Sequence, residues 1–136
     1  MDLVKSMMIS ASGIRAQSFR MRIISENIAN SQSVSSDPRV EPYRRKVVSF
    51  KNEVDRALGV PMVKIDKVTR DKAEFGQRYE PGHPAADKNG YVKLPNVNGL
   101  IETMDMQQAQ RSYEANLNAI EASKQMIIRT IEMLQE

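Results

Sequence analysis

Three side chains that can carry protons stand close together in one short stretch of the sequence: Glu80, His83 and Asp87. Carboxylates beside an imidazole can act as general acid and general base. That chemistry needs an apolar surrounding that moves their pKa values, whereas this stretch is interrupted by Pro81 and Pro84. We therefore interpret the three side chains as solvated loop residues. Because no P-loop, G-x-G-x-x-G or nucleophile elbow occurs in the sequence, we expect no enzyme, no catalytic residue and no cofactor.

A second chemical feature is the basic triplet Arg44, Arg45 and Lys46, which follows Tyr43 in a chain of formal net charge +3. Such a cluster could bind the phosphates of a nucleic acid. On a strand, however, Arg45 points to the opposite face from its two neighbours, which dilutes the patch. We expect no nucleic-acid partner and keep that function as a minor alternative. Two further roles stay open, namely contact with another subunit and a solvated strand edge that discourages aggregation.

The composition excludes several other kinds of site. The chain has 136 residues, which is at most one ordinary domain. It has no cysteine and a single histidine, so we expect no disulfide, no thiol nucleophile and no metal site. No apolar run approaches the roughly 20 residues that a membrane span needs. The N-terminus also lacks the apolar stretch of a cleaved secretory signal.

Proline and glycine divide the chain into three segments. All 6 prolines lie in residues 37–99, and residues 100–136 contain neither proline nor glycine. Both residue types mark turns, and their absence permits long helices. We therefore predict a mainly α fold with a small β part. Residues 1–36 and 100–136 form a discontinuous helical coiled-coil domain in this prediction, and residues 37–99 form a small β-rich or loop domain.

Apolar residues recur every seven positions in both terminal segments. This spacing is typical of helices that pair in a coiled coil. We expect the two long helices to pair antiparallel, with their seams acting as assembly interfaces, and Asn98 to cap the second helix. The predicted seam residues are Met7, Ile14, Met21, Ile28, Tyr113, Leu117, Ile120, Ile127, Ile131 and Leu134.

Each predicted helix also carries a second apolar stripe. The first helix has Met8, Ala16, Phe19 and Ile23, and the second has Ala115, Ala119, Ala122, Met126 and Met133. An antiparallel pair hides one stripe on each helix, so the second stripes need another neighbour. That neighbour is either the middle of the chain or another subunit, and we favour other subunits. Because the seams are rich in small residues, we also hypothesise that both helices are largely disordered in the monomer and order on assembly.

The middle segment alternates apolar and polar residues over short stretches. Strands are predicted at Tyr43–Phe50, Val60–Val68 and Tyr91–Leu94. Turns are predicted at Leu58-Gly59, Glu80-Pro81-Gly82 and Asn89-Gly90. A short antiparallel β-hairpin unit between the helices is the expected result.

Three stretches occur in a fixed order: SENIANS at 25–31, PYRRKVVSF at 42–50, and YEPGHPAAD, GYVKLPNV and RSYEAN between 79 and 116. They resemble signature segments of the bacterial flagellar axial family, the rod and hook proteins, and most of all its proximal-rod branch. The continuation T-P after the first signature is replaced here by QSVS at 32–35. The matching residues are Asn27, Ala29, Asn30, Tyr43, Arg44, Lys46, Pro81, Gly82, Pro84, Gly90, Tyr91, Pro95, Asn96, Arg111, Tyr113 and Asn116.

This resemblance implies a structural subunit of the proximal rod, the helical shaft that carries torque from the motor. It implies export through the flagellar type III channel without a cleaved signal peptide, and a place in the basal body within the periplasmic space. The implied partners are other copies of the chain, other proximal-rod and distal-rod proteins, the rod–ring junction protein and, in transit, the export apparatus. A generic coiled-coil adaptor remains the alternative, although it would explain the helices and not the particular turns.

Asn27 and Asn30 leave two readings open. Asn tolerates the left-handed conformation that often ends a helix, so the pair could simply terminate the first helix. Alternatively, the two amides could hold a turn against neighbouring subunits.

Overall fold

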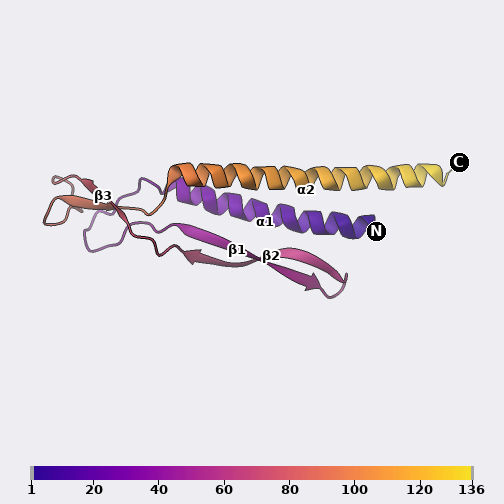
Figure 1. The fold of residues 1–136 in the computed structure, drawn as a ribbon, viewed down its shortest axis with the longest axis horizontal. Coiled ribbons are helices and arrows are strands. Elements are labelled where there is room, and N and C mark those ends of the chain that lie inside the picture. The colour runs from indigo at the N-terminus through magenta and orange to yellow at the C-terminus, as the bar shows by residue number, and fades with distance from the viewer. Residues whose placement is uncertain (1, 136) are drawn as a thin grey trace. The chain divides into compact units, whose positions relative to one another are not determined.

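The computed structural model describes residues 2–135 and contains two helices and four strands within that range (Figure 1). In chain order they are α1 (Leu3–Ala29), β1 (Lys46–Asp55), β2 (Val60–Arg70), β3 (Gly76–Tyr79), β4 (Tyr91–Leu94) and α2 (Gly99–Met133). The mainly helical fold with a small β part is therefore confirmed. No helix in the described range is long and apolar enough to cross a membrane.

Side-chain oxygens cap the beginnings of both helices. The Asp2 carboxylate accepts hydrogen bonds from the backbone N–H groups of Val4 and Lys5 at 3.0 and 3.4 Å. The Asn98 amide oxygen accepts from the N–H groups of Leu100 and Ile101, also at 3.0 and 3.4 Å. Each cap satisfies backbone donors that the first turn leaves without partners. The predicted Asn98 cap is therefore confirmed.

Serine and asparagine side chains end α1 at Ala29. The Asn30 amide donates to the Glu26 carbonyl oxygen at 2.8 Å, and the Ser31 hydroxyl donates to that of Ile28 at 2.7 Å. Such local bonds satisfy the last carbonyl groups and compete with continuation of the helix. No residue other than glycine has a positive φ in the described range, so the helix ends without the left-handed conformation considered for Asn30.

The four strands form two separate two-stranded sheets. β1 and β2 form a hairpin whose turn is held by the Asp55 carboxylate, which accepts from the N–H groups of Ala57 and Leu58. β3 and β4 are antiparallel, with Gly76 opposite Leu94 and Tyr79 opposite Tyr91. The predicted strand at Tyr91–Leu94 is confirmed, and β2 extends past its predicted end at Val68 to Arg70. β1 begins at Lys46, later than the predicted start at Tyr43, and continues past Phe50 to Asp55, and β3 was not predicted.

The chain divides into two compact units, and both helices and the hairpin contribute residues to each. Unit 1 consists of the described residues up to Met21, Ser49–Lys67 and those from Gln107 onward. Unit 2 consists of Arg22–Val48 and Val68–Met106.

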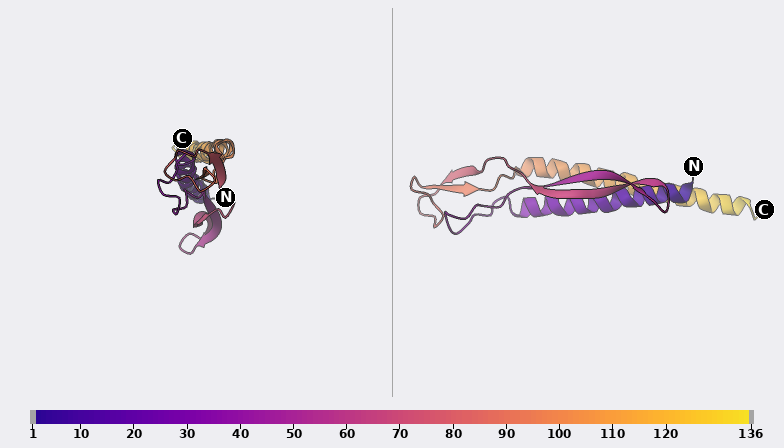
Figure 2. Two further views of the ribbon diagram at one scale, coloured as in Figure 1. Left: turned by 90° about the vertical axis from the view of Figure 1, so that its left-hand side faces the viewer. Right: turned by 90° about the horizontal axis from the view of Figure 1, so that it is seen from below.

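Small side chains form much of the packing in unit 1. Ala16 and Ala109 are almost completely buried, and a Cβ atom on Gly13 would lie only 2.8 Å from the Asn116 amide nitrogen. The Arg20 guanidinium donates to the Gln108 side chain at 3.2 Å. As the residue number rises along α1 the partner's number falls along α2, so the two helices run antiparallel here (Figures 1 and 2).

The hairpin also packs on α1 within unit 1. The Val63 N–H donates to the Ser12 hydroxyl oxygen at 3.1 Å, and Val60 and Met62 of the same strand are buried. Figure 2 shows β1 and β2 beside α1 in this part of the chain. Of the second stripe predicted for α1, Ala16 is buried within the chain itself, so at this position the chain supplies the neighbour and not another subunit.

Unit 2 contains an apolar and a polar core. Ile23 and Ile24 of α1, Ala85, and Val92 of β4 are buried. Two polar side chains are buried still more completely than most of these, Asn27 at 1% exposure and Glu102 at 0%. A buried polar side chain is costly unless it is hydrogen-bonded, so both residues require partners inside the unit.

Candidate functional site

Asn27 lies at the centre of a buried polar cluster in unit 2. Its amide nitrogen donates to the Lys46 carbonyl oxygen at 2.9 Å and to the Glu102 carboxylate at 3.1 Å. Its amide oxygen accepts from the Lys46 N–H at 2.9 Å and from the Tyr43 hydroxyl at 2.7 Å. An asparagine amide has two donor hydrogens and two acceptor positions, and all four are used. We call Asn27, Tyr43, Arg45, Lys46 and Glu102 the Asn27 cluster.

Arg45 neutralises the buried Glu102. Its guanidinium donates to the second carboxylate oxygen of Glu102 and to the Asp105 carboxylate at 3.2 Å, and it lies 3.7 Å from that of Asp71. Burial, the largest single influence, lowers the pKa of Arg45, but the carboxylates of Glu102, Asp105 and Asp71 together raise that pKa above its ordinary value. Because Glu102 is fully buried, it depends on Arg45 and Asn27 for stabilisation of its charge.

Asn96 attaches the start of β1 to two other segments. Its amide oxygen accepts from the Arg45 N–H at 2.8 Å. Its amide nitrogen donates to the carbonyl oxygens of Asp71 and Ala73 at 3.1 and 3.0 Å. Asn96 therefore holds the backbone next to the cluster in place.

The other two cations of the basic triplet are also paired within unit 2. The Arg44 guanidinium lies 4.3 Å from the ring centre of Phe75 and donates to the Asp71 carbonyl oxygen at 3.2 Å. The Lys46 ammonium bonds to the Glu26 carboxylate at 2.6 Å. The triplet is thus distributed among partners on its own chain, which corrects the interpretation of the triplet as a simple solvated strand edge.

The Glu26–Lys46 pair makes a direct test of this geometry possible. The hydrogen bond from Lys46 lowers the pKa of Glu26 below its usual 4.5. We expect the Glu26 carboxyl, followed by NMR, to titrate below pH 4.5 in the native chain and to return toward 4.5 in Lys46→Met. Because the folded-state pKa is lowered, any stability from this pair is present above pH 4.5 and is lost as the pH falls through the lower, folded-state value.

Glu53 provides the matched control for that titration. Hydrogen bonds from Lys64 and Lys51 lower its pKa too, and all three residues belong to unit 1. The Glu53 titration should therefore be unchanged in Lys46→Met. An unchanged Glu26 titration in that variant would contradict the pairing.

The stretch from Tyr79 to Tyr91 is a tight β3–β4 connection. Gly90 has φ +85°, and its N–H donates to the Asp87 carbonyl oxygen at 3.0 Å. The Asp87 carboxylate accepts from the N–H groups of Asn89 and Tyr91 at 2.8 and 2.9 Å. The Tyr79 and Tyr91 rings meet edge to face at 5.3 Å between centroids.

The three proton-carrying side chains of this stretch serve local structure. Asp87 holds the turn, the His83 Nδ1 atom accepts from the Ala85 N–H at 3.0 Å, and Glu80 pairs with Arg78. These bonds belong to loop geometry and not to an acid–base site. Within residues 2–135, no group of three or more His, Cys, Asp and Glu side chains could hold a metal ion.

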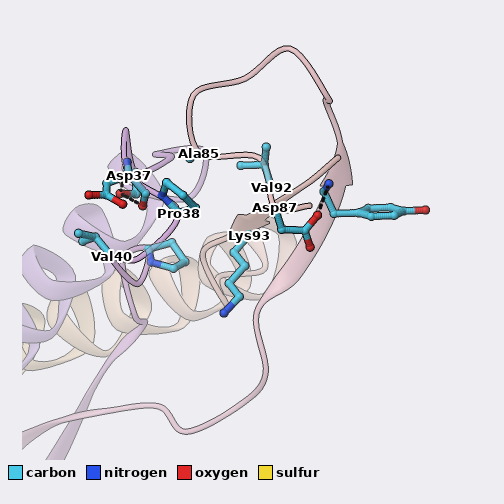
Figure 3. Close-up of a pocket in the computed structure, with 10 residues that line it drawn as sticks. Asp37, Pro38, Val40, Ala85, Asp87, Val92 and Lys93 are labelled. Carbon is cyan, nitrogen blue, oxygen red and sulfur yellow. Dashed lines mark hydrogen bonds between the residues drawn. The ribbon is translucent and has the colours of Figure 1, made fainter. Parts of the chain in front are cut away.

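A shallow hollow in unit 2 lies beside this connection. Figure 3 shows Pro38 and Val40 on one side of it and Val92 and Lys93 on the other. The Asp37 carboxylate at its edge is bonded to Arg39, and this bond lowers the pKa of Asp37. The hollow therefore offers apolar contacts, and the carboxylates that line it are already hydrogen-bonded within the chain.

Large apolar side chains are exposed on α2 in both units. In unit 2, Leu100, Ile101 and Met104 are 71%, 50% and 62% exposed. In unit 1 the exposed residues of this kind on α2 are Leu117, Met126, Ile128, Ile131 and Met133, and Leu134 directly after the helix is exposed as well. The second stripe predicted for α2 is exposed along its whole length, in contrast with Ala16 and Ile23 of the stripe on α1.

The predicted seam residues fall into two groups. Half-buried positions are Met7, Ile14, Met21, Tyr113, Ile120 and Ile127. Exposed positions are Ile28, Leu117, Ile131 and Leu134. The deepest helix positions are instead occupied by small or polar residues such as Ser12, Ala16 and Ala109, which the heptad pattern alone does not select.

The residues that resemble family signatures also divide by burial. Asn27, Gly90 and Pro95 are buried. Asn30, Tyr43, Arg44, Lys46, Asn96, Tyr113 and Asn116 are half-buried, and Ala29, Pro81, Gly82, Pro84, Tyr91 and Arg111 are exposed. Sequence reasoning missed Glu102 and Arg45 as a buried pair. The available signal was the presence of two acidic residues, Glu102 and Asp105, near the start of α2.

Comparison with known proteins finds relatives that match nearly the whole chain. The family model described as the flagellar basal body rod FlgEFG protein C-terminal matches residues 88–133. The flagellar basal-body rod protein FlgC of Agrobacterium fabrum is 50% identical over 127 residues, covering 93% of this chain and 91% of that protein. FlgC of Salmonella typhimurium is 39% identical over 99% of this chain and 100% of its own length. FlgC of Bacillus subtilis is 35% identical over 98% of this chain and 99% of its own length.

Proposed function

We propose that this chain is a subunit of the proximal part of the rod, because it belongs to the family of flagellar basal-body rod proteins FlgC. The chain is a structural protein of the flagellar basal-body rod and not an enzyme. The observation that carries this conclusion is the identity of 50% to a FlgC protein over 93% of the chain. The finer proposal is that copies stack helically with other rod proteins and transmit motor torque.

The exposed apolar side chains of α2 support assembly as the role of this chain. Leu100, Met104 and Met133 are each more than half exposed, and apolar surface of this kind marks contact sites. A shaft needs repeated heterologous contacts that do not close on themselves. We propose that the two helices form an antiparallel coiled coil in the rod and that residues 1–36 and 100–136 act there as the helical domain around a β-rich part at 37–99.

The remaining parts of the proposal concern partners and location. The partners would be other copies of the chain, other proximal-rod proteins, distal-rod proteins and the rod–ring junction protein, with the export apparatus engaged in transit. The location would be the rod within the periplasmic space, reached without a cleaved signal peptide. These statements rest on membership of the family.

The rival functions lack comparable support. A nucleic-acid module would need a free basic surface, whereas Arg44, Arg45 and Lys46 are each paired within unit 2. A generic coiled-coil adaptor would not require the Asp87 turn or the Asn27 cluster.

Genetic replacement tests the proposed function. The gene for this chain would replace the FlgC gene of Agrobacterium fabrum, the relative at 50% identity. We expect swimming and complete basal bodies, whereas an empty-vector strain should have neither. Stable, exported chain that never enters basal bodies would contradict the proposed function.

The exposed end of α2 gives a second test. We expect Ile131→Ser with Leu134→Ser to lower the yield of complete basal bodies at least tenfold, because burial of each large apolar side chain contributes about 1.5–3 kcal/mol. The two residues are 50% and 82% exposed, so the free subunit should keep its stability within about 0.5 kcal/mol. The measurements are basal-body yield by electron microscopy and urea unfolding of the purified chain.

The matched control is Glu132→Ser, a polar substitution in the same exposed turn. It should leave the basal-body yield unchanged. Normal yield in the double variant would show that this face is not an assembly contact.

A further inference from the structure

We infer that Asn27 is a positioning residue that works inside each subunit: with Glu102 and Lys46 it forms a polar clamp before the subunit meets any neighbour. This inference replaces both readings of Asn27 left open by its sequence, because the amide neither simply ends the helix nor contacts a neighbour but joins three segments of its own chain. It stands on the contacts of one chain, and only its consequence for assembly rests on the proposed function.

The hydrogen-bonding capacity of Asn27 is the first argument. The amide offers two donor hydrogens and two acceptor positions, and residues of its own chain occupy all four at 2.7–3.1 Å. The side chain is only 1% exposed. A neighbouring subunit would have to break one of these bonds to reach the amide. Asn27 is therefore not an interface residue.

The separation of its partners along the chain is the second argument. Asn27 belongs to the last turns of α1, Lys46 is the first residue of β1, and Glu102 lies in the first turn of α2. The partners are 19 and 75 residues away in sequence. Lys46 is held at both its N–H and its carbonyl oxygen, so the clamp fixes the position and direction of the strand start. Three segments are thus joined at one side chain.

The burial of Glu102 makes the clamp cooperative. Its carboxylate is fully buried and is stabilised by Asn27 on one oxygen and by Arg45 on the other. If any one of the three segments is absent, the others retain buried polar groups without partners, which is unfavourable. The clamp therefore forms as a whole. Because the clamp orders unit 2 in the monomer, the hypothesis that the helices are disordered before assembly then applies only to the helical stretches of unit 1.

The clamp has a consequence for the surface of unit 2. Ile101 is next to Glu102 in α2, and its side chain is 50% exposed. Leu100 and Met104 are exposed as well. By holding the first turn of α2, Asn27 positions this apolar surface. On the proposed function, the surface would meet another rod protein without Asn27 itself touching that protein.

The first experiment uses the native chain alone. In the NMR spectrum of dilute monomer, we expect the side-chain amide hydrogens of Asn27 to exchange with solvent at least about tenfold more slowly than those of Asn118, which is exposed. In Glu102→Gln the Asn27 amide signal should shift, because its charged acceptor has become neutral. Exchange of Asn27 as fast as that of Asn118 would show that the clamp is absent from the monomer and would overturn the inference.

The second experiment separates positioning from contact by comparing Asn27→Leu with Ile101→Ser. Asn27→Leu should remove the protection of the Lys46 amide in the monomer and also prevent basal-body assembly. Ile101→Ser should leave Lys46 protected and impair assembly alone. An Asn27→Leu monomer with normal Lys46 protection would overturn the inference, whether or not it assembles.

Both experiments give an answer independent of the proposed function. The amide measurements need no rod, so a chain that fails genetic replacement can still show the clamp. If Asn27→Leu does not fold, the exchange of Asn27 in the native monomer decides the matter. Conversely, assembly can succeed while the Asn27 side-chain amide exchanges fast in the monomer. That result would overturn the clamp and leave the proposed rod function standing.

Discussion

Replacing Arg45 with methionine is expected to lower the free energy of unfolding by about 3–5 kcal/mol, because it leaves the carboxylate of Glu102 buried without its cation. Glu102 is 0% exposed, and Arg45 is the cation that pairs with its carboxylate in unit 2. Breaking one side of a buried pair costs more than the pair itself contributes, since the remaining charge cannot reach water. Urea unfolding followed by circular dichroism measures the loss.

Arg44 is the matched control, because it is the neighbouring residue of the same type. Its cation lies over the Phe75 ring and pairs with Glu41, whose side chain is 63% exposed. Arg44→Met should therefore cost only about 1 kcal/mol. Adding Glu102→Gln to Arg45→Met should restore part of the stability, because the amide accepts from Asn27 without carrying a charge. Equal losses for the two arginine variants would contradict the assignment of Arg45 to the buried pair.

Substitution of Gly90 by alanine is expected to be the second most damaging change, with a loss of about 2–3 kcal/mol. Gly90 has φ +85°, a conformation that residues with a Cβ atom adopt only with strain. The added Cβ would also lie 2.9 Å from a ring carbon of Tyr79 and 3.1 Å from the Pro81 Cβ. The tyrosine pair would have to move, so its near-ultraviolet circular dichroism should weaken as well.

Gly82 in the same connection provides the comparison. A Cβ atom there would have nothing within 4 Å, and its φ is not positive. Gly82→Ala should leave stability unchanged to within about 0.5 kcal/mol. A Gly90→Ala chain as stable as the Gly82→Ala chain would mean that the turn relaxes freely and that Gly90 is not required.

The helices and three of the four strands could be predicted because their signals are local. Seven-residue apolar spacing, the Asn98 cap and the absence of proline after residue 99 all act within a few turns. β3 carries no such signal: Gly76, Gln77, Arg78 and Tyr79 are all exposed, and they form a strand only because β4 pairs with them. A strand defined by its partner cannot be recognised from its own four residues.

The candidate site was predictable only in part for a related reason. Asn27, Tyr43 and Lys46 were selected through family resemblance, but nothing nearby in the sequence indicates that Glu102 joins them from 75 residues away. The basic triplet was misinterpreted because it was placed on a strand, whereas β1 begins only at Lys46 and Arg44 and Arg45 precede it. Strand alternation therefore does not describe the first two residues, and it does not identify the carboxylates that pair with them. The burial of Ala16 on α1 was not predictable for the same reason, since Val63, which bonds to the nearby Ser12, lies 51 residues away in sequence from Ser12.

The exposed thioethers of α2 make the free subunit chemically vulnerable. Met104, Met126 and Met133 are 62%, 54% and 70% open to solvent. Peroxide converts such side chains into sulfoxides, which are polar and disfavour close apolar association. A subunit oxidised in this way would keep its buried ion pair and its turns but would associate poorly with other subunits. Oxidation would therefore inactivate newly made subunits before they are incorporated into the assembled structure.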